Sequence, residues 1–261
     1  MNIVVLLKMV PDAVEELEVG PDGRSLDTEF LRMIVSESDD HALEEALILK
    51  EKHGGKVTVL ALDAPEIDDT LFAALAKGAD RAVKIVGETT GLSTNAIARV
   101  LADALSRDTS LAAADLVLTG TQAIDDLDGL TAPLVAHRLG RPFLGIVTGI
   151  AADLPSKRAT VTIEFPSGVR GSYELPLPAV LGVQSAEKQP RYVPVAKVRA
   201  AMKSGRIETV SSLGAAEPVP VLAKVVQMSK PKVLSHAEML DGEPAEVAGR
   251  LSEILSERGL L

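Results

Sequence analysis

Short apolar runs alternate with segments of helical period along the first 140 residues. The runs are rich in Val, Leu and Ile, which is typical of strands that are buried on both faces of a parallel sheet. Such strands are predicted at residues 3–7, 57–62, 82–86 and 116–119. Predicted helices begin near residues 38 and 67 and end at Gly54 and Gly78, and two more span 94–106 and 131–139. The alternation predicts an α/β fold with a doubly wound, mostly parallel sheet, which binds ligands at the carboxyl ends of its strands.

The pattern changes after Phe143, where strands follow one another without helices. They are predicted at 144–151, 159–165, 169–175 and 178–183, with a turn at Pro166-Ser167-Gly168. A turn signal within residues 16–25 also predicts a small hairpin. Residues 184–206 carry several prolines and basic residues and are interpreted as an arm, and 246–258 as an amphipathic helix. We therefore expect an α/β domain with an added β region over 1–183, then an arm and a C-terminal helix over 184–261.

Composition narrows the function classes. The formal net charge of −10 argues against nucleic acid as a partner, although the arm is locally basic and therefore a candidate interaction segment. The absence of cysteine excludes disulfides, Fe–S clusters and thiol chemistry. The apolar run at the N-terminus is too short for a signal peptide, and no stretch has the length of a membrane span, so a cytoplasmic protein is expected.

The loop over residues 119–131 is the strongest candidate binding site. It joins a buried strand to a helix and contains Gly120, Gly129 and the acidic residues Asp125, Asp126 and Asp128. A small polar loop of this kind lets backbone N–H groups approach an anion such as a phosphate at the helix N-terminus. The same residues also fit a capped loop without a ligand, and their spacing alone does not separate the two interpretations.

The sequence shows no set of residues arranged for proton transfer or nucleophilic catalysis. The four histidines, at 41, 53, 137 and 236, are scattered and are interpreted as surface or helix-end residues, and no metal site is expected. The loop carboxylates could hold a cation, but capping and contact with a ribose fit their surroundings better. Lys8, just after the first strand, could contact a ligand or extend along the edge of the sheet. This inventory indicates a binding protein or a subunit of a larger assembly.

Four stretches, in order, resemble the beta (small) subunit of electron transfer flavoprotein, including its FixA-type and electron-bifurcating relatives. They are Val4-Val5-Leu6-Leu7-Lys8, Ala42-Leu43-Glu44-Glu45-Ala46-Leu47, Leu75-Ala76-Lys77-Gly78-Ala79-Asp80-Arg81 and Gly120-Thr121-Gln122-Ala123-Ile124-Asp125-Asp126. Pro190-Arg191-Tyr192 falls where the family has Pro-Arg-Tyr before its arm. The resemblance covers roughly the first 205 residues, and its motifs are weak singly but strong together.

The resemblance implies an electron carrier subunit, not an enzyme, in a heterodimer with an alpha subunit that carries the electron-transferring FAD. This chain would itself bind AMP, or a second FAD in bifurcating members. The residues that would bind this nucleotide are Leu6, Lys8, Ser36, Glu37, Ser38, Asp39, Leu62, Gly120, Thr121, Gln122, Ala123, Ile124, Asp125, Asp128, Gly129, Leu130 and Thr131. The arm would dock a dehydrogenase through Tyr192, Val195 and Lys197.

Some positions depart from the family pattern. Residues 36–39 are Ser-Glu-Ser-Asp where the family has Asn-Pro-Phe-Asp/Cys, and 195–197 are Val-Ala-Lys where ordinary members have Leu-Pro-Asn. Ala132-Pro133 is nearer to the Gly-Pro of bifurcating members. The choice between AMP and FAD and the identity of the dehydrogenase therefore stay open.

Two other functions fit the sequence less well. A free-standing adenine-nucleotide sensor of the universal-stress type shares the general sheet order, but the extension after Phe143 and the arm argue against it. An adenylating enzyme on a related fold needs a Ser-Gly-Gly loop after the first strand, and Met9-Val10-Pro11-Asp12 does not provide one.

Overall fold

The computed structural model describes residues 1–261 except 90, 127, 213–219, 222, 232–236 and 238. Within the described residues, nine strands form one sheet in the order β11-β5-β4-β1-β6-β10-β7-β8-β9. The strands are β1 (Asn2–Leu7), β4 (Lys56–Leu62), β5 (Arg81–Val86), β6 (Leu116–Gly120), β7 (Phe143–Asp153), β8 (Arg158–Glu164), β9 (Arg170–Pro176), β10 (Ala179–Val183) and β11 (Ile207–Ser211). Pairing is parallel from β11 to β7 and antiparallel from β7 to β9, which confirms the predicted fold class.

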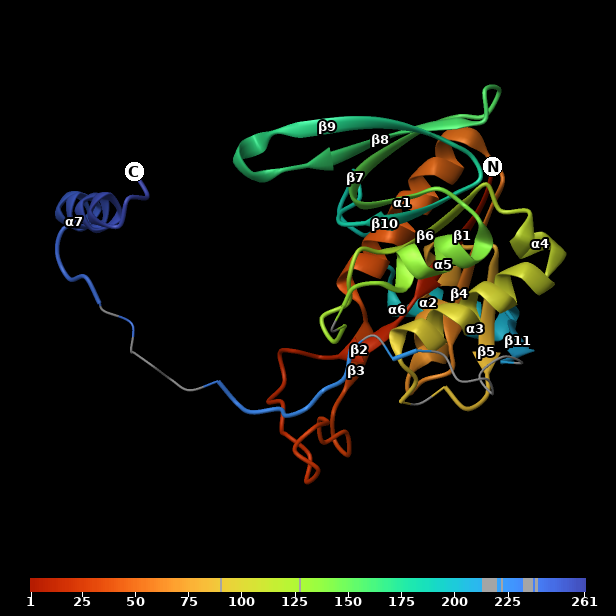
Figure 1. The fold of residues 1–261 in the computed structure, drawn as a ribbon, viewed down its shortest axis with the longest axis horizontal. Coiled ribbons are helices and arrows are strands. Elements are labelled where there is room, and N and C mark those ends of the chain that lie inside the picture. Colours follow the sequence, from red (N-terminus) through yellow and green to blue (C-terminus); the bar gives the residue numbers. More distant parts are fainter. Residues whose placement is uncertain (90, 127, 213–219, 222, 232–236, 238) are drawn as a thin grey trace.

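Helices cover both faces of the parallel part of the sheet (Figure 1). Alternate side chains of each strand point to opposite faces. Ile3, Val5 and Leu7 therefore pack with α1 (Glu37–His53) and α2 (Ile67–Lys77), whereas Val4 and Leu6 pack with helices of the other face. Those helices are α3 (Thr94–Arg107), α4 (Thr109–Ala112) and α5 (Thr131–Leu139). The resulting core is almost wholly aliphatic, as a chain with 2% aromatic residues requires.

The chain changes direction across the sheet at β1. The strands that follow it, β4 and β5, are added on one side of β1, and β6 then pairs with the other side. The connections after β1 and β6 consequently leave the carboxyl edge of the sheet in opposite directions. A crevice between diverging connections is where doubly wound folds bind their ligands.

A small excursion separates β1 from α1. In it β2 (Met9–Pro11) pairs with β3 (Met33–Val35) in an antiparallel two-stranded sheet. Further out, Val19 and Leu26 form an antiparallel bridge, and Gly20 N–H donates to Ser25 C=O at 2.8 Å. This bridge confirms the hairpin predicted within residues 16–25.

The segment interpreted as an arm is more structured than its composition indicates. It contains α6 (Val195–Ser204), which packs near α2, and it leads directly into β11, which pairs in parallel with β5 as the edge strand of the sheet. The C-terminal helix α7 (Pro244–Glu257) agrees with the predicted 246–258, and Figure 1 shows it apart from the sheet. No helix in the described part of the chain is both long and apolar enough to cross a bilayer.

Candidate functional site

A cavity of about 410 Å³ opens at the carboxyl edge of the sheet, where β1, β4 and β6 end. The first turns of α3 and α5 contribute Thr94 and Thr131 to its wall. It therefore lies in the crevice that the change of direction at β1 creates.

The structure brings nine of the sequence-predicted site residues to this cavity. They are Leu6, Lys8, Asp39, Leu62, Gly120, Thr121, Ala123, Asp125 and Thr131. The other eight predicted residues are close to these in sequence but do not line the cavity. They are Ser36, Glu37, Ser38, Gln122, Ile124, Asp128, Gly129 and Leu130. Among these, Ile124 is 64% exposed, and Ser38 Oγ donates to the Gln122 carbonyl at 3.1 Å.

Asp39 joins the ends of the two central strands. It lies in the first turn of α1, is 4% exposed, and accepts from Lys8 N–H at 2.8 Å and from Gly120 N–H at 2.6 Å. Burial raises the pKa of this carboxyl to about 7, although both backbone donors act to lower it. Its side chain thus holds β1, β6 and α1 in register at the cavity.

Lys8 connects the end of β1 to the loop after β6. Its Nζ lies 2.7 Å from Asp125 Oδ1 and 2.6 Å from Asp126 Oδ1. Burial acts to lower the pKa of Lys8, but the hydrogen bonds and charges of the two carboxylates outweigh it and the pKa is raised. The ammonium therefore forms an ion-pair bridge at the wall of the cavity.

The two loop glycines are required for different reasons. A Cβ on Gly120 would lie 2.1 Å from Ser38 Oγ, so this residue allows α1 to approach the strand closely. Gly129 has a φ of +61°, a left-handed conformation that favours glycine, and a Cβ there would meet the Gln122 side chain at 3.0 Å. Gln122 in turn donates from Nε2 to the Asp126 carbonyl at 3.2 Å, which folds the loop on itself.

Helix α5 begins beside the cavity without a side-chain cap. Leu130 occupies the N-cap position, and Asp128 Oδ1 accepts the Leu130 N–H at 3.2 Å. The first N–H groups of a helix lack partners within the helix and carry its positive dipole end. Since Thr131 lines the cavity, this helix start can receive an anionic group from a ligand.

Sequence reasoning missed the half of the cavity that follows β4 and β5. Asp63, Ala64 and Pro65 follow β4, and Ile97 and Leu101 come from α3. The rule that parallel strands end at the same edge could have identified the first three, because residues 57–62 were already predicted as a strand. The α3 residues carry only an ordinary helical pattern, which gives no such signal.

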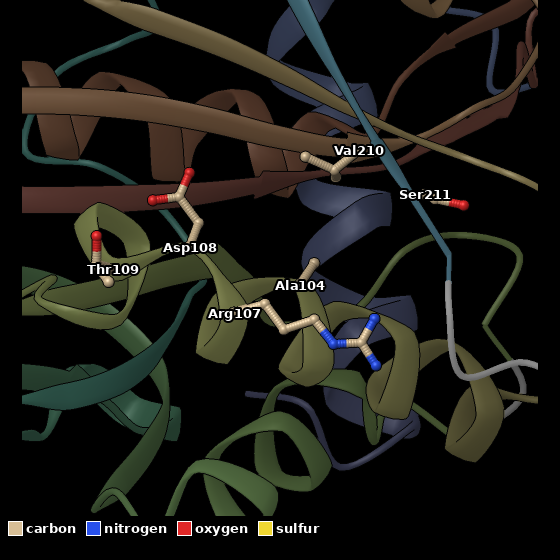
Figure 2. Close-up of a pocket in the computed structure, with 6 residues that line it drawn as sticks. All are labelled: Ala104, Arg107, Asp108, Thr109, Val210 and Ser211. Carbon is tan, nitrogen blue, oxygen red and sulfur yellow. The ribbon is translucent and has the colours of Figure 1, made fainter.

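Figure 2 shows a second hollow, whose carboxylate already has partners within the fold. It has a volume of about 390 Å³ and lies where α3 and α4 meet β11. Its carboxylate, Asp108, pairs with Arg81 at 2.9 Å and accepts from Ser110 N–H and Leu111 N–H, so it is already engaged in the fold. Among the described residues, no group of three His, Cys, Asp or Glu side chains is arranged to hold a metal ion.

One histidine differs from the sequence expectation. His41 was expected at the surface or a helix end, but it is buried in α1, where its Nδ1 accepts the Ala186 N–H at 3.2 Å. His53 and His137 are exposed near helix ends, as expected, and His236 lies outside the described residues.

The predicted docking residues lie just before α6 and in its first turn. Tyr192 is 85% exposed and Val195 61% exposed, and Lys197 is exposed beside them. The neighbouring Arg191 fixes this segment to α1, because its guanidinium and its N–H both bind the buried carboxylate of Glu44 at 2.8–3.1 Å.

Comparison with known proteins supports the family resemblance. The model of the electron transfer flavoprotein domain matches residues 26–216. The chain is 31% identical to the electron transfer flavoprotein subunit beta of Clostridium acetobutylicum, and 29% identical to that of Methylophilus methylotrophus, each over 98% of both chains. It is also 34% identical to protein FixA of Azorhizobium caulinodans, over 80% of this chain and 74% of that protein. The chain therefore belongs to the electron transfer flavoprotein family, in its beta-subunit and FixA branch.

Proposed function

We propose that this chain is the beta subunit of a heterodimeric electron transfer flavoprotein, and that it holds an adenine nucleotide, AMP or a second FAD, in the cavity at the carboxyl edge of its sheet. The alpha subunit would carry the FAD that exchanges electrons between a dehydrogenase and an acceptor. The observation that carries this proposal is the cavity itself, which lies at the strand ends where the loop resembling the nucleotide loop of the family begins.

The shape of the site supports an adenine ligand. Leu6, Leu62 and Ile97 provide apolar walls of the kind that a base packs against, and the start of α5 opens into the same space. A phosphate fits best at Thr131, where the helix dipole favours it. It fits poorly beside Asp125, because two negative charges at short range repel each other. The nucleotide would therefore be held by apolar packing and backbone N–H groups.

No reactive side chain is needed for this role. Lys8 and the carboxylates of Asp39, Asp125 and Asp126 are engaged with one another or with backbone N–H groups, and Asp63 pairs with Lys84. We infer that the subunit acts by binding the nucleotide and shaping the heterodimer, while the flavin performs the redox chemistry.

The arm is the proposed site of dehydrogenase docking. Tyr192 and Val195 are exposed apolar residues, and Lys197 and Arg199 add positive charge on a chain whose net charge is −10. A partner with an acidic surface around an apolar pocket would complement this segment.

We propose that the complex is located in the cytoplasm.

Co-expression with the adjacent alpha-like reading frame tests the proposal. The purified complex is denatured, and the released nucleotides are separated and counted against protein. One FAD and one AMP per heterodimer identify an ordinary carrier, and two FAD identify a bifurcating one. A colourless homodimer that binds ATP contradicts the proposal and favours the universal-stress-type sensor.

A further inference from the structure

The cavity is acidic, although the ligand proposed for it is an anion. Asp39, Asp63, Asp125 and Asp126 line it, whereas Lys8 is the one basic side chain among the described residues of its wall. A phosphate that enters this space gains from the start of α5 but is repelled by each carboxylate that keeps its charge. The charge of the wall therefore affects how strongly a phosphate can bind there.

For two of the four carboxylates, groups other than the Lys8 ammonium reduce the negative charge. Asp39 accepts two backbone N–H groups and has a pKa raised by burial to about 7, so its negative charge is partly suppressed. Asp63 Oδ1 lies 3.3 Å from Lys84 Nζ on β5. The remaining pair, Asp125 and Asp126, lies in the loop that leads to α5 and has Lys8 as its cationic partner, while Asp126 Oδ2 also accepts the Ala123 N–H at 3.2 Å.

Two hydrogen bonds fix the backbone of Lys8, one through its N–H and one through its carbonyl. Its N–H donates to Asp39 Oδ2 at 2.8 Å, and its carbonyl accepts the Ser36 N–H at 2.9 Å. The side chain therefore starts from a fixed point and reaches both loop carboxylates, at 2.7 and 2.6 Å. Because these carboxylates raise the pKa of Lys8, the ammonium keeps its proton across the neutral range.

We propose that Lys8 is a specificity-determining residue of the nucleotide site, which admits phosphorylated adenine ligands by offsetting part of the negative charge of Asp125 and Asp126 and does not itself touch the phosphate. This inference rests on the proposed function, since it requires an adenine nucleotide in the cavity. It assigns to Lys8 a selection between ligands that differ in charge, a role that a purely structural ion pair does not have.

Binding of AMP and of adenosine to the purified heterodimer tests the proposal, after its own nucleotide has been removed and with calorimetry at low and high salt. Lys8→Met removes the charge and keeps an unbranched side chain, and Lys8→Arg keeps the charge. Lys50→Met is the matched control, because Lys50 forms an equivalent ion pair with Asp80 at 2.7 Å, beside the amino end of β4.

Lys8→Met is expected to weaken AMP binding about tenfold at low salt, as the loss of one nearby charge implies, and to affect adenosine much less. The effect shrinks at high salt because ions screen it. Lys8→Arg and Lys50→Met keep the wild-type preference for AMP. Adding Asp125→Asn to Lys8→Met restores part of that preference, because it removes one of the two negative charges that Lys8 partly offset.

Equal losses for AMP and adenosine would show that Lys8 is only structural, and unchanged binding in Lys8→Met would also overturn the proposal. A double variant that recovers nothing would point to direct contact between Lys8 and the phosphate, against the inference. If the wild-type heterodimer binds neither ligand and also carries no second FAD, the proposed function itself fails; that result differs from the others because it does not depend on any variant.

Discussion

Substitution of Gly129 by alanine offers a sharp test of the loop, because Gly140 provides a matched control. The two glycines flank α5 and have nearly the same backbone conformation, with φ of +61° and +62°. Alanine at either position must adopt a left-handed conformation, which costs about 1 kcal/mol. We therefore expect both variants to lower the melting temperature by a similar 2–4 °C, roughly.

Only Gly129→Ala should affect the nucleotide. Its Cβ would lie 3.0 Å from Gln122 Cδ, so Gln122 must move and its hydrogen bond to the Asp126 carbonyl is disturbed. A Cβ at Gly140 meets no atom within 4 Å. Gly140 also lies about 13 Å from Gly129, at the other end of the nine-residue helix α5. The side chain at 129 thus perturbs the loop beyond the shared backbone cost.

The assay is the nucleotide content of each purified heterodimer, measured after denaturation and again after extended dialysis. Gly129→Ala is expected to lose its nucleotide faster than the wild type, whereas Gly140→Ala retains it at the wild-type rate. Retention at the wild-type rate by both variants would refute the role assigned to the loop. A loss in both would instead attribute the effect to lowered stability.

Three further outcomes are expected. Burial raises the pKa of Asp39 from 3.8 to about 7, so its contribution to stability is fully present below about pH 4 and is lost as the pH rises through 7. Relative to Asp39→Asn, the wild type should therefore lose up to about 4 kcal/mol of unfolding free energy between pH 4 and 8, and parallel pH profiles in urea titrations would contradict this. Glu44→Ala should destabilise the fold by about 1–3 kcal/mol, since it leaves the half-buried Arg191 without its main partner, whereas Glu51→Ala, at an exposed end of the same network, should cost less than about 0.5 kcal/mol. Equal denaturation midpoints for these two variants would argue against that contact. Tyr192→Ala should change stability by less than about 0.5 kcal/mol and leave the nucleotide content unchanged, because the side chain is 85% exposed; a larger shift in melting temperature would mean that Tyr192 packs within this chain.

The central sheet was predictable because its strands are apolar on both faces. The predicted runs at 3–7, 57–62, 82–86 and 116–119 lie within β1, β4, β5 and β6. By contrast, β11 reads Ile-Glu-Thr-Val-Ser, a half-polar sequence that lies at the edge of the sheet and is not buried on both faces. Such a strand is defined by its pairing with β5, which the local sequence does not encode.

The candidate site was predictable where one continuous loop forms it. Residues 119–131 stand out because glycines and carboxylates gather between a strand and a helix. The contact of Lys8 with Asp126 was not predictable, since it joins residues 118 positions apart and depends on how β1 and β6 align. The burial of Asp39 was not predictable either, because an acidic residue in the first turn of a helix is normally exposed and interacts favourably with the helix dipole.

A crystal structure of the heterodimer with its bound nucleotides tests the central claim most directly. The account predicts an adenine nucleotide in the cavity of this chain, with its base against Leu6 and Leu62 and a phosphate at the N–H groups where α5 begins. A nucleotide bound elsewhere on the chain, or a cavity closed by its own side chains in the loaded complex, would contradict it.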